Sequence, residues 1–265
     1  MSDTPLLELR GISKSYGSVQ ALTDVDFEVR DGEVMALVGD NGAGKTTLIK
    51  CIAGIHGFDS GEIVFEGEQV TIHGPKDAVK LGIEVVYQDL ALCDNLDVVQ
   101  NMYLGREERD WLFRLKEPLM EQQAWSLLRQ LSAKIPSVRT AVASLSGGQR
   151  QTVAIARSLI GDPSIVMLDE PTAALGVEQT AEVLNLIERL RERGHGVLLI
   201  THNMANVQAV ADRAVVLRLG RNNGTFQVKD VTYEDIIAAI TGATESAVTR
   251  RAASRAQLTS GESPS

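Results

Sequence analysis

Apolar residues alternate with polar ones, or form short unbroken runs, over much of the first ninety positions of the chain. Both patterns are typical of β-strands, the alternating one for strands with one face buried and the unbroken one for strands buried on both faces. The strands predicted in this way cover residues 7–10, 25–29, 34–38, 62–65, 70–72 and 83–87. A proline in the first turn predicts a short helix over residues 75–81.

The pattern changes to helical spacing between residues 101 and 134, where Leu119, Trp125, Leu128 and Leu131 recur near the period of an α-helix. This stretch predicts a mostly helical insertion, which we place at about residues 89–160. Strands and helices then alternate again. The predicted elements are a helix after Ser146, a strand at 165–168, a helix at 177–193, a strand at 197–200, strands at 215–219 and 225–228 joined by a turn at 220–224, and a helix at 232–240.

Composition and charge narrow the picture further. The 265 residues include 44% hydrophobic ones, which is ordinary for an α/β protein, and residues 243–265 offer little to bury, so we expect a disordered tail there. The formal net charge of -9 argues against nucleic acid as the main partner. Cys51 and Cys93 indicate neither a disulfide framework nor a zinc site. No signal peptide and no run of roughly 20 apolar residues is visible, so we expect a cytoplasmic chain that reaches a membrane only through partner subunits.

The sequence GDNGAGKTT, residues 39–47, is the strongest chemical signal in the chain. It matches the phosphate-loop motif in the context that the motif requires, between an apolar strand and the start of a helix. Its glycines allow backbone N–H groups to approach phosphate oxygens, and the helix N-terminus favours the same anion. A turn that binds nothing would not need lysine and threonine in this register. The predicted nucleotide-binding residues are Gly39, Asp40, Asn41, Gly42, Ala43, Gly44, Lys45, Thr46 and Thr47.

Two carboxylates follow the apolar run at residues 165–168. Asp169 would hold Mg²⁺ and Glu170 would act as the general base for an attacking water. A surface acidic pair after a core strand is the alternative. The phosphate loop earlier in the chain favours the catalytic interpretation.

A third motif, LSGGQ at residues 145–149, begins a predicted helix. Ser146 is a natural N-cap, and the two glycines leave backbone N–H groups free to face an anion. Alone, the pentapeptide could be only a capped helix start.

Together, the three motifs resemble the ATP-binding cassette (ABC) ATPases, and the resemblance extends to about residue 242. It implies an α/β phosphate-loop NTPase core with an N-terminal antiparallel β subdomain and a helical insertion. Three further positions match the family. Tyr16 stands where the family has the aromatic that stacks on adenine, Gln88 where it has a glutamine that contacts Mg²⁺, and His202 where it has a histidine that touches the γ-phosphate.

The resemblance also implies partners. Family members pair head to tail, so that the phosphate loop of one subunit and the signature of the other enclose each ATP. Lys45 would then bind phosphate, and Thr46, Gln88 and Asp169 would hold Mg²⁺. The signature residues that would act on the neighbour's ATP are Ser146, Gly147, Gly148 and Gln149. One position departs from the family, since Gly176 replaces the usual aspartate and so puts communication between the two ATP sites in doubt.

Residues 87–107 look most like cassettes of bacterial importers for simple sugars such as ribose, xylose or fructose. We therefore expect an ATP-hydrolysing subunit, peripheral on the inner face of the membrane, that works with membrane-spanning permease subunits and an extracytoplasmic sugar-binding protein. The alternative is a soluble ABC-type ATPase that acts on nucleic acid or ribosomes. A small-molecule kinase, a third class, would not need the signature.

Overall fold

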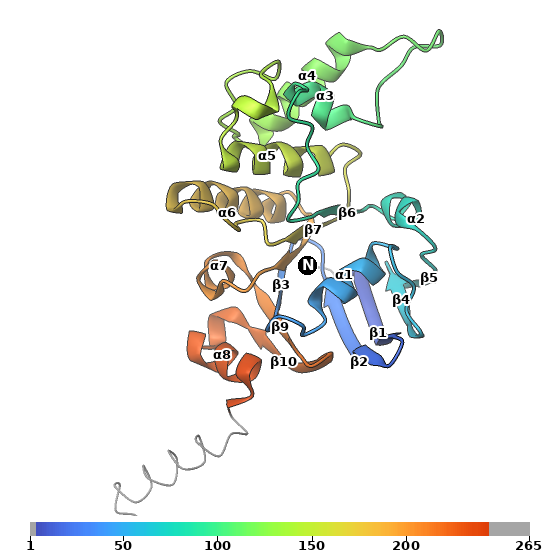
Figure 1. Ribbon diagram of the computed structural model, residues 1–265, viewed down its shortest axis with the longest axis vertical. Helices are drawn as coiled ribbons and strands as arrows, with labels where there is room; N and C mark the ends of the chain where they lie inside the picture. The colour runs from blue at the N-terminus through green and yellow to red at the C-terminus, as the bar shows by residue number, and fades with distance from the viewer. Residues whose placement is uncertain (1–3, 244–265) are drawn as a thin grey trace, which may run out of the picture.

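The computed structural model describes residues 4–243, which form two β-sheets and eight α-helices (Figure 1). The first sheet is antiparallel, with the strand order β2-β1-β4-β5. Its strands are β1 (Leu7–Tyr16), β2 (Val19–Val29), β4 (Ser60–Phe65) and β5 (Glu68–Val70). The first two are longer than predicted. Register shifts after Leu9, Ile12 and Lys14 break the alternation of apolar and polar residues by which the sequence marks a strand.

The second sheet has six strands in the order β10-β9-β3-β8-β7-β6. They are β3 (Val34–Val38), β6 (Ile83–Val86), β7 (Ile165–Asp169), β8 (Gly196–Ile200), β9 (Arg213–Arg218) and β10 (Arg221–Gln227). Strands β9 to β6 run parallel, and β10 alone is antiparallel to its neighbour. The carboxyl ends of β3, β6, β7 and β8 therefore share one edge of the sheet.

The hairpin between β9 and β10 corrects one prediction. The turn consists of Leu219 and Gly220, with φ of 49° and 76°, which suits the two-residue turns that match the twist of paired strands. Residues 221–224, predicted as connection, belong to β10 instead. The irregular register between Asn222 and Thr225 explains why they do not look like a strand in the sequence.

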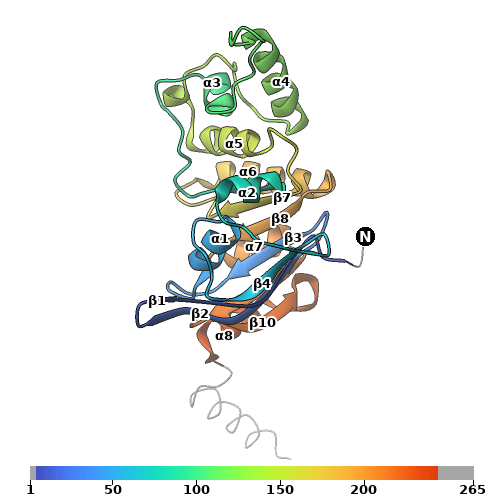
Figure 2. The same ribbon diagram turned by 90° about the vertical axis from the view of Figure 1, so that its right-hand side faces the viewer.

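Helices cover the six-stranded sheet and extend away from it (Figures 1 and 2). Both views show α6 lying next to the sheet, α5 beyond α6, and α3 and α4 farther out. The helices are α1 (Lys45–Ile52), α2 (Pro75–Lys80), α3 (Val98–Tyr103), α4 (Glu117–Gln130), α5 (Gly147–Ser158), α6 (Val177–Glu192), α7 (Met204–Val210) and α8 (Tyr233–Thr241). Within residues 4–243, no helix has the length and apolar content needed to span a bilayer.

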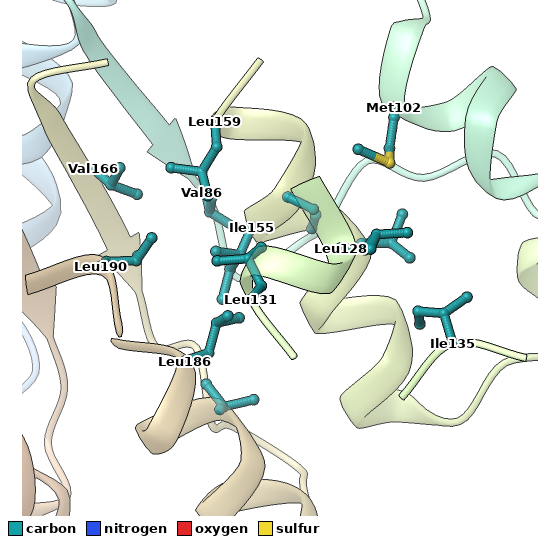
Figure 3. Packing of buried hydrophobic residues seen from close by; sticks show 14 of the residues in the cluster. Val86, Met102, Leu128, Leu131, Ile135, Ile155, Leu159, Val166, Leu186 and Leu190 are labelled. Atoms are coloured by element: carbon teal, nitrogen blue, oxygen red, sulfur yellow. The ribbon is translucent and has the colours of Figure 1, made fainter. Parts of the chain in front are cut away.

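Strands β3, β7, β8 and β9 of the second sheet are buried on both faces, as unbroken apolar runs predict, whereas the edge strand β10 is mostly exposed. In β3, Met35 and Leu37 pack against the antiparallel sheet and α1, whereas Ala36 and Val38 face α7 and α8. A third cluster joins the sheet to the helical end of the molecule. Figure 3 shows Val86 and Val166 from the sheet near Leu190 of α6 and Ile155 of α5, with Leu128 of α4 beyond.

The insertion is less helical than the sequence predicts. Only α3 and α4 are α-helical between residues 101 and 134, and residues 104–116 form an irregular connection between them. The period in α4 is correct: of the four apolar residues that mark it, Leu128 and Leu131 are buried and Trp125 packs against the same cluster. Met120, Ala124 and Leu128 are buried and Leu119 is 37% exposed. Of the predicted tail, residues 244–265 lie outside the described residues, so the disorder expected there stays a prediction.

Candidate active site

The phosphate loop connects β3 to α1, as predicted, and its backbone can be built only with glycine at two positions. Gly39 has φ of 151°, and a Cβ atom there would lie 2.2 Å from the carbonyl oxygen of Leu217. Gly44 has φ of 104°, and its Cβ would lie 2.8 Å from the carbonyl oxygen of Ala21. At both positions a side chain would have to adopt an unfavourable positive φ and would collide with a backbone carbonyl oxygen. Movement of neighbouring side chains could not relieve either problem. The conformation of the loop therefore requires glycine at positions 39 and 44.

Lys45 folds back over the loop from which it comes. Its Nζ donates to the carbonyl oxygen of Gly39 at 2.6 Å and to that of Asp40 at 3.0 Å. Burial lowers the pKa of this ammonium, against the opposing influence of the Glu170, Asp40 and Asp169 carboxylates. The cation is thus held against the loop by the Gly39 and Asp40 carbonyl oxygens, where its partly desolvated charge is suited to a phosphate group.

The acidic pair lies at the end of β7, one strand beyond β8 from the phosphate loop. Burial raises the pKa of Asp169, and the adjacent Glu170 carboxylate raises it further, whereas Lys45 and Lys50 oppose this shift. A cation bound beside Asp169 would favour its ionised form. Glu170 has φ of 49°, a left-handed conformation that costs a non-glycine residue about 1–3 kcal/mol and that recurs at functional sites.

The Glu170 carboxylate is oriented by the residues that follow β8. The backbone N–H of His202 donates to Glu170 Oε1 at 3.1 Å, and His202 Nδ1 lies 2.7 Å from the same oxygen. Since a carboxylate only accepts, Nδ1 carries the proton in this contact. Thr201 Oγ1 lies 3.4 Å from the second oxygen, Oε2. Glu170 and His202 are therefore one hydrogen-bonded unit, which the sequence did not predict.

The other two family positions lie at the margins of this site. Gln88 is exposed and follows β6, whose Val86 pairs with Leu168, so it lies close to the level of the acidic pair. Tyr16 ends β1, is 43% exposed, and pairs with Val19 of β2. The structure therefore brings Lys45, Asp169, Glu170 and His202 together, with Gln88 beside them and Tyr16 at the antiparallel sheet.

The signature lies elsewhere. Ser146 caps α5: its Oγ accepts from the Gln149 N–H at 3.2 Å, and Gln149 Oε1 accepts from the Ser146 N–H at 3.0 Å. Gln149 Nε2 also donates to the carbonyl oxygen of Lys134 at 2.8 Å, so both ends of this side chain are engaged within the chain. Figures 1 and 2 both show α5 beyond α6, on the far side from α1. The structure does not bring the signature to the phosphate loop of the same chain.

The match to a known family agrees with this arrangement. The family model described as ABC transporter matches residues 22–173, more than half of the chain. The chain belongs to the ABC transporter family. That membership confirms the resemblance predicted from the sequence and, with it, the ATP-binding and ATP-hydrolysing class of the protein.

Relatives of known name resemble the chain over almost its whole length. It is 46% identical to the xylose/arabinose import ATP-binding protein XylG of Sulfolobus acidocaldarius, covering 91% of this chain and 95% of XylG. It is 45% identical to the fructose import ATP-binding protein FrcA of Rhizobium meliloti, covering 92% and 97%. A ribose import ATP-binding protein, RbsA of Yersinia pestis, is 41% identical, and the match covers 91% of this chain but only 47% of RbsA.

Solved structures confirm the fold. The crystal structure of the ADP conformation of an ATP-binding cassette of an ABC transporter superposes with a TM-score of 0.79 at 25% identity, covering 90% of this chain and 99% of that one. The predicted α/β core with an antiparallel subdomain and a helical insertion is therefore correct.

Sequence reasoning missed the residues that support the site. Thr201 is fully buried and also accepts a hydrogen bond from the Asn203 N–H at 3.0 Å. Asn206 is buried and donates to Thr172 Oγ1 at 2.7 Å, which ties α7 to the segment after Glu170. A threonine directly after a buried apolar strand was the available signal for Thr201, but nothing in the sequence pairs Asn206 with Thr172.

Proposed function

We propose that this chain is the energy-supplying subunit of an importer for a simple sugar. It would bind at the inner face of the membrane to permease subunits and act with an extracytoplasmic sugar-binding protein. The single observation that supports ATP hydrolysis best is the convergence at one sheet edge. Four parallel strands end there in the phosphate loop, Gln88, the acidic pair and His202. Open α/β sheets place their ligand sites at this edge.

In the proposed mechanism, Lys45 and the loop N–H groups bind the β- and γ-phosphates. The Glu170 carboxylate removes a proton from the water that attacks the γ-phosphorus. His202 donates through Nδ1–H to Glu170, and in its doubly protonated form it would also donate from Nε2–H to a γ-phosphate oxygen. The adenine base would stack on Tyr16.

Residues suited to Mg²⁺ are present. Carboxylate, hydroxyl and amide oxygens are ligands that Mg²⁺ accepts, and Asp169, Thr46 and Gln88 offer one of each. Burial disfavours the ionised Asp169 carboxylate, and a nearby cation would offset that cost. When bound, Mg²⁺ would neutralise charge on the β- and γ-phosphate oxygens. The structure also shows no cluster of three or more His, Cys, Asp or Glu side chains suited to a metal among its described residues.

The signature would complete the site of a second copy of the chain. Gly147 and Gly148 bring their backbone N–H groups to the first turn of α5, where the capping box engages the N–H groups of Ser146 and Gln149. Within one chain, α5 lies beyond α6 on the far side from α1 (Figures 1 and 2), and this arrangement supports a head-to-tail dimer in which each ATP lies between two subunits. We also propose that residues 1–242 form one cassette, with a helical insertion at about residues 89–160.

The sugar class rests on the likeness to xylose/arabinose, fructose and ribose import proteins. Uptake of a panel of labelled sugars, in cells with and without this chain, would test it. Loss of uptake for one sugar supports the proposal. Unchanged uptake of every sugar, together with co-purification of RNA or DNA, would favour the nucleic-acid alternative.

Glu170→Gln is the matched control for that experiment. We expect it to preserve ATP affinity while slowing hydrolysis by roughly 10²–10⁴-fold, the usual contribution of a general base. Sugar uptake should fall with it, although the protein is present and folded. A Glu170→Gln protein that hydrolyses ATP at the parental rate would show that another group activates the water.

A further inference from the structure

Tyr16 is contacted by two other side chains of its own chain. Lys14 places its Nζ 5.6 Å from the centroid of the Tyr16 ring. The His56 ring lies 5.7 Å from it, centroid to centroid, at an interplanar angle of 78°, which is an edge-to-face contact. Tyr16 nevertheless remains 43% exposed, so its ring has surface for a third contact.

Both neighbours are themselves fixed. Lys14 Nζ lies 3.0 Å from Asp59 Oδ1, and Asp59 Oδ2 accepts from the Ser15 N–H and hydroxyl, each at 2.6 Å. The bonds from Ser15, and then that from Lys14, lower the pKa of Asp59 to about 2, so the carboxylate stays ionised at neutral pH. His56 follows α1 closely, and its backbone N–H donates to the carbonyl oxygen of Lys50 at 3.1 Å. Strand β1 and the end of α1 therefore converge on one aromatic ring.

The end of β1 that carries Tyr16 lies near the phosphate loop. Tyr16 pairs with Val19, and two residues farther along β2 the carbonyl oxygen of Ala21 approaches Gly44 so closely that a Cβ there would lie 2.8 Å from it. A base attached to a nucleotide in that loop is therefore within reach of Tyr16. Base stacking by itself needs only the aromatic ring, so the contacts of Lys14 and His56 with that ring call for a separate explanation.

We propose that Lys14 and His56 are positioning residues that hold the Tyr16 ring in the orientation on which the nucleobase of the bound nucleotide stacks. This inference rests on the proposed ATP site. A Tyr16 ring that is already held loses little rotamer freedom when the base binds. The entropy cost of ordering the side chain is then smaller, and ATP binds more tightly. Lys14 supplies a cation–π contact and His56 an edge-to-face contact.

The test compares two ligands, ATP and inorganic tripolyphosphate, which carries the phosphates without the base. Affinities for both are measured by titration calorimetry on the full chain. We expect His56→Ala and Lys14→Ala each to weaken ATP binding about threefold to tenfold. Tyr16→Ala should weaken it roughly tenfold to 100-fold. Tripolyphosphate affinity should not change in any of the three.

Conservative variants and a matched control complete the design. His56→Phe preserves an aromatic edge and Lys14→Arg preserves the cation, so both should bind ATP within about twofold of the parent. His73→Ala removes an exposed histidine that no ring contact links to Tyr16, and should change neither affinity.

Other results would overturn the proposal. Equal losses for ATP and tripolyphosphate would make Lys14 or His56 a phosphate ligand or a general stabiliser of the fold. Unchanged ATP affinity in Lys14→Ala and His56→Ala would show that neither residue positions the ring, and unchanged affinity in Tyr16→Ala would show that the base binds elsewhere. In both cases ATP hydrolysis by the parent would leave the proposed function intact. A parent that binds no ATP would overturn the proposed function itself.

Discussion

Two glycine-rich segments begin helices in this molecule, and they use glycine for different reasons. In the phosphate loop, Gly39 and Gly44 have positive φ, and a Cβ at either would meet backbone atoms. In the signature, Gly147 and Gly148 are helical and lie outside that region of φ. A Cβ at Gly147 would lie 3.0 Å from Leu175 Cδ2, the flexible end of a side chain.

The difference separates what the chain needs in order to fold from what it needs in order to work. Substitution in the phosphate loop conflicts with the chain's own backbone, so its glycines are intramolecular requirements. The fold itself barely requires a glycine at position 147. The lack of a side chain at Gly147 is better explained by a molecule that approaches α5 from outside the chain. In our proposal this molecule is the ATP bound by the second subunit.

The largest effect is expected when the phosphate loop is mutated in one subunit and the signature in the other. Lys45→Ala removes the phosphate-binding cation and Gly147→Asp places a carboxylate where the γ-phosphate would approach, so each variant alone should be nearly inactive. Mixed dimers combine both lesions in one site and leave the other site intact. Random pairing makes roughly half of the dimers mixed. We therefore expect mixing to restore ATPase activity to a substantial fraction of the parental value, measured as phosphate release.

A mixture that stays inactive would be compatible with a requirement for two good sites, so a second measurement decides. The specific activity of the unmutated protein should rise with its concentration, because a monomer lacks a complete site. Constant specific activity at dilutions where sedimentation detects only monomer would contradict the shared-site arrangement.

The next effect tests the glycines directly. We expect Gly39→Ala to destabilise the fold by at least about 1–3 kcal/mol, since positive φ and a backbone clash act together. Gly147→Ala should change the free energy of unfolding by less than about 1 kcal/mol, because only the end of the Leu175 side chain must move. Urea denaturation of the two variants measures both. Equal destabilisation would erase the distinction between the two segments.

The same distinction decides what could be predicted from the sequence. The phosphate loop, the acidic pair and the signature are local motifs, and every one lies on the predicted element. What the sequence could not supply are the contacts between distant segments. The bond from His202 to Glu170, 32 residues apart, and the contact of Tyr16 with His56 depend on strand order. The bulges in β1 and the two-residue turn at Leu219 also escape a search for strict alternation.

A smaller effect concerns pH. Burial raises the pKa of Asp169 in the folded chain, so its contribution to stability is full below the unfolded pKa of about 3.9 and is lost as pH rises through the folded pKa. Asp169→Asn cannot ionise. We therefore expect this variant to be more stable than the parent at pH 7 without nucleotide or Mg²⁺, and the difference to vanish near pH 3. Thermal unfolding across this range measures it, with Mg²⁺-dependent hydrolysis lost in the variant. An Asp169→Asn variant that is less stable than the parent at pH 7 would contradict the raised pKa of Asp169.

The smallest expected effect lies at Gly176, which begins α6 beside the signature. Its φ of -72° and ψ of 169° suit any residue, and nothing lies within 4 Å of a Cβ there, so Gly176→Asp should introduce no strain. Aspartate is a better N-cap than glycine by a few tenths of a kcal/mol, and its charge favours a helix N-terminus by about 0.3–1 kcal/mol. We expect the melting temperature to rise by roughly 1–3 °C, measured by calorimetry.

This substitution also sharpens the comparison between the two segments. In the proposed head-to-tail dimer, Gly176 would leave the neighbourhood of the signature without the carboxylate that the resemblance to the family implies there. If that carboxylate links the two ATP sites, the parent should hydrolyse ATP with a Hill coefficient near 1, and Gly176→Asp should increase it. Val177→Ala is the matched control, since Val177 is the adjacent residue and is 92% exposed. A higher melting temperature with an unchanged Hill coefficient would assign Gly176 to helix capping alone. In that case the two sites would communicate through other residues or act independently.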